Sequence, residues 1–143
     1  MGGGLVVALT ACSKEQRLIR QLEGQWQWQK IEEAPVAHIG ISDSVQHFFR
    51  FLACRRAYTS SCRCVYSMEK SGVTPVTLVD TLIYDLKSDE MSITQFLSQK
   101  TAPNSSPEGI LNNRRFRVVI KGSILELRNV QIPAFKIVAQ KVP

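Results

Sequence analysis

The chain has 143 residues, 44% of them hydrophobic, and its 18 Lys and Arg against 12 Asp and Glu give a formal net charge of +6. This length suits one domain, and the hydrophobic fraction is enough to build a core. The sequence contains no repeat, coiled-coil heptad or long low-complexity tract, which excludes repeat and fibrous architectures. The basic excess indicates a solvated basic surface, or anionic partners such as lipid head groups and acidic polymers.

The first motif along the chain is Leu-Thr-Ala-Cys at residues 9–12, between an apolar run and a charged segment. It resembles the bacterial lipobox, the tetrad after which a signal peptidase cuts. The resemblance implies that residues 1–11 are a removed signal segment. It also implies that Cys12 becomes a lipidated N-terminus, which anchors the protein to a membrane of the cell envelope, on the periplasmic face or in the outer membrane. An exported protein would rarely meet nucleic acid, so none is expected as a partner.

Other interpretations of this segment fit less well. The apolar run is about half of the roughly 20 residues that a spanning helix needs. Three glycines at positions 2–4 disfavour a buried strand. The basic region that normally opens a signal segment is missing, which leaves the true translation start open.

Residues 13–23 are predicted to form one short helix. Ser13 followed by Gln16 is typical of a capping box. The apolar residues at 18, 19 and 22 share one helical face, and Gly24 stands where a helix ends.

After Gly24 the hydrophobic period becomes two, which is typical of half-buried strands. We expect eight strands, at residues 25–29, 48–52, 63–68, 76–84, 91–97, 115–120, 123–127 and 135–139. A loop rich in Pro, Asn and Ser at residues 101–113 interrupts them. Short turns without crossover helices predict an all-β fold, an antiparallel up-and-down meander that can close into a barrel. A barrel of this size is either filled by side chains or holds one small ligand.

The segment Leu-Glu-Gly-Gln-Trp at residues 22–26 resembles the opening of lipocalin-like domains found in bacterial lipoproteins. Their Gly-x-Trp motif starts the first strand after a short helix. The resemblance implies a tether and helix at residues 12–23, followed by a lipocalin-like barrel at residues 24–143. It implies that Gly24 lets the chain turn from helix to strand, and that Trp26 packs at the closed end of the barrel.

Two further lipocalin features are less well matched. The family places an arginine over its tryptophan from near the last strands, and Arg128 stands at a suitable place, with Arg114 and Arg117 as alternatives. The Thr-Asp-Tyr turn of the larger animal lipocalins is not found.

Charged residues predict which strand faces point inward. Arg50 and Arg63 should face water, which sends their neighbours on either side into the barrel. The apolar face of the fourth strand carries Asp80, a buried carboxylate that would need a basic partner such as Lys30, or a wet cavity. As a polar group on an apolar wall, it is also a candidate ligand contact. The candidate ligand-binding residues are Trp28, Phe51, Tyr66, Asp80 and Leu82.

Three cysteines remain after the lipobox: Cys54, Cys62 and Cys64. In an oxidising compartment, Cys54 is expected to form a disulfide with one of the other two, which leaves one cysteine over. Strand alternation points Cys54 outward and its partners inward, which conflicts with such a bond unless a bulge intervenes. The Cys-x-Cys spacing is not that of a zinc knuckle, so no metal site with His47 is expected. His38 and His47 are interpreted as surface or edge residues.

No motif of a nucleophile, metal-dependent hydrolase or phosphate-binding loop is present, so neither catalysis nor a cofactor is expected. Two functions from different classes remain. The first is a lipid-anchored binding protein that holds a small apolar molecule in its barrel. The alternative is a non-enzymatic envelope protein with a filled barrel and a basic partner surface at Arg114, Arg115 and Arg117. The sequence leaves the oligomeric state undetermined.

Overall fold

The computed structural model describes residues 14–35, 41–54, 61–72, 75–96 and 107–143. The tetrad with Cys12, and Ser13 of the capping box, lie outside these ranges. A first helix occupies residues 14–22. The remaining elements, in chain order, are β1 (Gly24–Glu32), β2 (Val45–Phe51), β3 (Cys62–Lys70), β4 (Val76–Lys87), β5 (Glu90–Phe96), α2 (Pro107–Leu111), β6 (Arg115–Lys121), β7 (Ile124–Asn129) and β8 (Lys136–Lys141).

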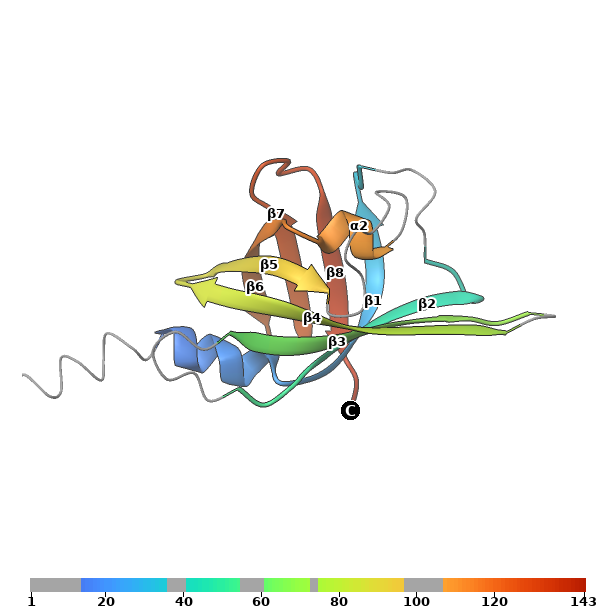
Figure 1. Cartoon of the computed structure of the whole chain (residues 1–143), viewed down its shortest axis with the longest axis horizontal. Coiled ribbons are helices and arrows are strands. Elements are labelled where there is room, and N and C mark those ends of the chain that lie inside the picture. Colours follow the sequence, from blue (N-terminus) through green and yellow to red (C-terminus); the bar gives the residue numbers. More distant parts are fainter. Residues whose placement is uncertain (1–13, 36–40, 55–60, 73–74, 97–106) are drawn as a thin grey trace, which may run out of the picture.

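The strands form one antiparallel sheet in which neighbours in sequence are neighbours in space. β1 pairs with β2 on one side and with β8 on the other, so the sheet closes on itself as a barrel. Figure 1 shows β1, β7 and β8 running in a direction that β3, β4 and β5 cross. The prediction of eight antiparallel strands is confirmed.

The strand pairings differ in length around the barrel. β3 and β4 share nine residue pairs, from Cys62 with Tyr84 to Lys70 with Val76. β5 and β6 share only three, with Met91 opposite Phe116 in the middle. This junction is therefore the least extensively paired of the eight.

The segment between β5 and β6 contains a helical turn, so the prediction of a plain loop at residues 101–113 is wrong in part. α2 begins at Pro107, and proline suits the first helical position because it has no N–H to leave unpaired. Asn113 has a φ of 58°, the left-handed conformation that commonly ends a helix. Ile110 and Leu111 from α2 are fully buried in the core.

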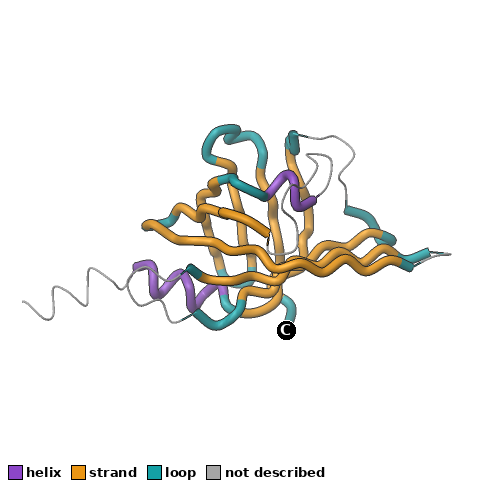
Figure 2. Tube along the Cα trace, viewed as in Figure 1, coloured by secondary structure: helices purple, strands orange, loops and turns teal. Residues whose placement is uncertain are grey.

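The two helices lie at opposite ends of the barrel (Figures 1 and 2). The first helix buries Ile19 and Leu22, two residues of its predicted apolar face. α2 buries its own apolar pair at the other end. Among the described residues, no helix is long and apolar enough to cross a membrane.

The junction of the first helix with β1 is built around Trp26. Its ring is fully buried, and its Nε1–H donates to the Leu22 carbonyl at 2.7 Å. Lys141 at the end of β8 places its Nζ 5.3 Å from the ring centroid and donates to the Glu23 carbonyl at 2.9 Å. The cation over the tryptophan is thus Lys141.

Arg128 does not take that role, which corrects the expectation. Its side chain is 46% exposed on β7 and forms an ion pair with Glu126 at 3.5 Å. The alternative Arg117 is exposed as well and pairs with Asp89. The cation comes from β8 because Lys141, the final residue of that strand, pairs with Trp26 of β1. Arg128 lies on β7, which is a neighbour of β6 and β8 in the sheet.

Gly24 makes the turn from helix to strand possible. Its φ is +123°, a value that residues with a side chain rarely adopt, and an added Cβ would lie 3.1 Å from Lys141 Cε. The backbone geometry therefore favours glycine at the turn from helix to strand, which is the role that the Gly-x-Trp motif implies for Gly24.

We expect Gly24→Ala to lower the free energy of unfolding by more than about 1 kcal/mol, because a Cβ strains the backbone and displaces Lys141. Urea denaturation followed by tryptophan fluorescence measures this. Gly122→Ala is the matched control, since Gly122 also has a positive φ of +61° but nothing lies within 4 Å of an added Cβ. An equal loss in both variants would contradict the proposed crowding against Lys141.

Candidate functional site

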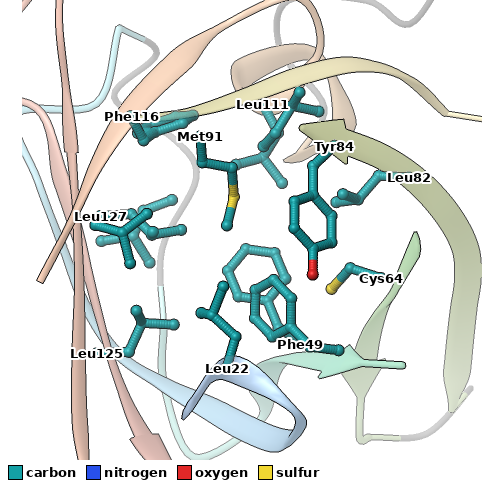
Figure 3. Packing of buried hydrophobic residues seen from close by; sticks show 14 of the residues in the cluster. Leu22, Phe49, Cys64, Leu82, Tyr84, Met91, Leu111, Phe116, Leu125 and Leu127 are labelled. Atoms are coloured by element: carbon teal, nitrogen blue, oxygen red, sulfur yellow. The ribbon is translucent and has the colours of Figure 1, made fainter. Parts of the chain in front are cut away.

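The barrel interior is formed by the inward side chains of all eight strands together with the two helices. Figure 3 shows residues from opposite walls, including Leu22, Phe49, Met91 and Leu125, converging on one core. The largest fully buried side chains are Trp26, Trp28, Tyr66, Tyr84, Phe49, Phe116, Phe135, Leu22, Leu82, Leu86 and Met91. Aromatic rings dominate this interior.

All five candidate ligand-binding residues point into the barrel and are buried: Trp28, Phe51, Tyr66, Asp80 and Leu82. The structure brings Trp28 and Tyr66 together, with ring centroids 5.6 Å apart. Asp80 lies opposite Tyr66 on the neighbouring strand. Phe51 and Leu82 lie deeper along the same wall, where Phe51 contacts the Tyr84 ring at 5.5 Å between centroids.

His47 belongs to this group, and its interpretation as a surface or edge residue is wrong. It is 1% exposed, and its ring stacks on Trp28 with centroids 4.8 Å apart. Its Nδ1 shares a hydrogen bond of 2.7 Å with the Tyr66 hydroxyl. The signal was available, because His47 has the same strand parity as Phe49 and Phe51. His38 lies outside the described residues.

Asp80 is 5% exposed, and its Oδ1 accepts a hydrogen bond from the Thr81 backbone N–H at 2.8 Å. The predicted partner Lys30 is instead on the outer surface, where its Nζ pairs with Glu32 at 3.1 Å. The reason is a register shift in β1 between Trp28 and Lys30, which breaks the alternation of inward and outward residues. The pairing of Asp80 with Lys30 is therefore wrong.

Two interior donors are left without a hydrogen-bond partner among the described residues: Trp28 Nε1 and the Tyr84 hydroxyl. Both side chains are buried almost completely. Burial raises the pKa of Tyr84, with Cys64 and Glu23 adding to the effect, so its hydroxyl keeps its proton. An unpaired buried donor costs about 1–3 kcal/mol. Trp28 and Tyr84 are therefore the two residues whose buried donors are unsatisfied in the described interior.

Two of the described cysteines form a disulfide, and a third is buried in the core. Cys54 and Cys62 form a disulfide, one of the pairings left open by the sequence. The conflict with strand alternation disappears because β2 ends at Phe51, so the alternation does not extend to Cys54. Cys64 is a free thiol within the core, and burial raises its pKa well above the usual value.

No metal centre is found among the described residues. Cys62 is held in the disulfide, so its sulfur is not a thiolate for a metal ion.

The arginines of the alternative partner surface differ in environment. Arg115 and Arg117 on β6 are exposed and pair with Glu90 at 3.7 Å and Asp89 at 3.2 Å. Arg114 is half-buried, and its Nε is a buried atom without a hydrogen-bond partner among the described residues. The three residues therefore do not form one uniformly exposed basic patch.

No protein-family model matches the chain, and no curated protein matches it either. Among solved structures, the chain is similar to an uncharacterised protein from Bacteroides eggerthii, with 17% sequence identity and a TM-score of 0.49. That similarity covers 85% of this chain and 99% of the other. Because the neighbour is itself uncharacterised, the similarity adds nothing about activity.

We expect Tyr66→Phe to lower the free energy of unfolding by about 1–3 kcal/mol, because it removes the partner of the buried His47 Nδ1. Chemical denaturation measures the loss. The matched control is the double variant His47→Phe with Tyr66→Phe, which removes both partners and should cost less than the sum of the two single changes. Strict additivity would show that this hydrogen bond contributes nothing.

Proposed function

We propose that the protein is a lipid-anchored, lipocalin-type binding protein of the cell envelope, which holds a small and mostly apolar molecule inside its barrel. The observation that carries this proposal is the unpaired Trp28 Nε1–H within an interior that is mostly apolar and aromatic. Binding sites for small molecules combine an apolar wall with a few convergent polar groups. The wall formed by β1 to β4 has this composition.

The polar groups of this wall lie around Trp28. Its ring contacts His47, Phe49 and Tyr66, with centroid distances between 4.8 and 5.6 Å. The His47 and Tyr66 side chains hold each other by their hydrogen bond, which keeps both rings against the indole. A pre-ordered aromatic wall loses little side-chain entropy when a ligand binds.

The envelope location rests on two features of the chain. The Leu-Thr-Ala-Cys tetrad provides a lipidation site at Cys12. The disulfide between Cys54 and Cys62 suits an oxidising compartment. The first helix is already formed at residue 14, so little chain separates Cys12 from the barrel. A lipidated Cys12 would therefore hold the barrel close to the membrane, where apolar molecules are concentrated.

We expect the purified protein to bind the neutral fluorescent probe N-phenyl-1-naphthylamine saturably and with a stoichiometry of one. Trp28→Phe should weaken this binding about threefold to tenfold, the effect of losing one hydrogen bond and some ring contact. Trp26→Phe is the matched control, because the Trp26 Nε1–H is already bonded to Leu22. Probe fluorescence measures both affinities. Absence of saturable binding, or equal effects of the two substitutions, would count against the proposal and favour a filled barrel.

We expect Cys12→Ser to move the protein from the membrane fraction to the soluble fraction when both forms are expressed in a bacterium with a lipoprotein pathway. Cys64→Ser is the control, since the free thiol of Cys64 lies in the core and has no role in anchoring. Immunoblots of the two fractions give the readout. A Cys12→Ser protein that stays with the membrane would remove the lipid anchor from the proposed function and leave the barrel site untouched.

A further inference from the structure

The charge of the interior restricts what it can bind. Among the described residues, no lysine or arginine is buried, and the buried polar or charged residues are His47, Asp80 and Asn129. Asn129 is engaged in the turn after β7, where its Oδ1 accepts from the backbone N–H groups of Gln131 and Ile132. Among the described residues, Asp80 is therefore the buried acidic residue of this wall.

Arg114 is a half-buried basic residue, and its Nε is a buried atom. It stands just before β6, on the far side of the strand order from β1 to β4. The other described lysines and arginines are exposed, apart from Lys136, which is half-buried and pairs with Glu32 and Glu126 at 3.2 and 3.3 Å. Within the described ranges, therefore, no lysine or arginine is buried against the aromatic wall.

The interior also carries a second unpaired donor. Figure 3 shows the Tyr84 ring extending from β4 into the core, with its hydroxyl directed toward the middle, near Cys64 and Phe49. This hydroxyl has no hydrogen-bond partner among the described residues. A series of ring contacts, from Trp28 to Phe49, then Phe51, then Tyr84, joins the two donors with centroid distances between 4.9 and 5.5 Å. The two donors thus lie along one continuous aromatic surface.

We propose that the ligand is an uncharged molecule with oxygen acceptors on an apolar body, of the ester or ketone class, and that Tyr84 and Trp28 donate hydrogen bonds to it. This inference rests on the proposed function and narrows its ligand. Trp28 can only donate, so its partner must accept. A carboxylate ligand such as a fatty acid is disfavoured, because burying an anion is costly and the described residues supply no buried lysine or arginine to pair with it.

A matched pair of probes tests the charge preference: 12-(9-anthroyloxy)stearic acid and its methyl ester, which share one body and differ in one ionised group. At neutral pH we expect the ester to bind the full-length protein at least about tenfold more tightly than the acid, measured by anthroyl fluorescence. Arg114→Gln should change neither affinity.

Tyr84→Phe tests the second donor. It should weaken binding of the ester about threefold to tenfold. The unfolding free energy of the ligand-free protein should stay equal or rise, because the hydroxyl has no partner to lose. A merely structural role would give the opposite pattern, with lower stability and unchanged affinity, and would overturn the assignment of Tyr84.

The remaining outcomes separate the two proposals. Equal binding of acid and ester, or acid binding that Arg114→Gln abolishes, would overturn the uncharged ligand while supporting an interior binding site. Failure of both probes to bind would overturn the binding function itself, and the inference with it.

Discussion

The pairing of β1 with both β2 and β8 is the constraint on which the rest of the structure depends. Once the sheet is closed, every second residue of each strand faces one shared interior, and the other residues face outward. The aromatic wall, the buried thiol and the buried carboxylate all follow from this closure. The outer residues then form ion pairs across strands, as Lys136 does with Glu32 and Glu126.

Closure of the sheet also buries polar groups in an apolar interior. An interior of this kind is stabilised by apolar burial, yet it contains donors that the described residues do not satisfy. His47 and Tyr66 show one solution, in which two buried polar side chains bond to each other. Trp28 and Tyr84 lack such a solution. Phenylalanine at position 84 would keep the ring and remove one of these unpaired groups without breaking a hydrogen bond among the described residues.

The strand pattern could be predicted from the sequence because the alternation of apolar and polar residues is local. It can be recognised within each strand without knowing the partner strand. The inward placement of Phe51, Tyr66 and Leu82 followed from the same rule. Lys30 shows where the rule fails: the register shift in β1 depends on pairing with β8, more than a hundred residues away in the chain. The cation over Trp26 was assigned to the wrong residue for the same reason, since contacts between the first and last strands have no local signal.

His47 and α2 were missed for a different reason, because their local signals were present but were outweighed. A histidine is more often exposed than buried, yet this one shares its parity with two phenylalanines. The proline and asparagine around α2 are turn residues as well as helix boundaries, and the short apolar pair between them is ambiguous.

The contacts that Lys141 makes with Glu23 and Trp26 have a consequence for the folding of the chain. Lys141 and Glu23 are 118 positions apart in the chain. Apart from the β1–β8 pairing, each strand pairing joins two strands that follow one another in the chain. Hairpins between successive strands can form early, because each closes only a short loop. The β1–β8 pairing must wait for β8, so until that strand is in place the folding chain is an open sheet with two exposed edges. The contacts of Lys141 thus form when β8 closes the sheet. Before that closure, the open edges make the chain most prone to aggregation.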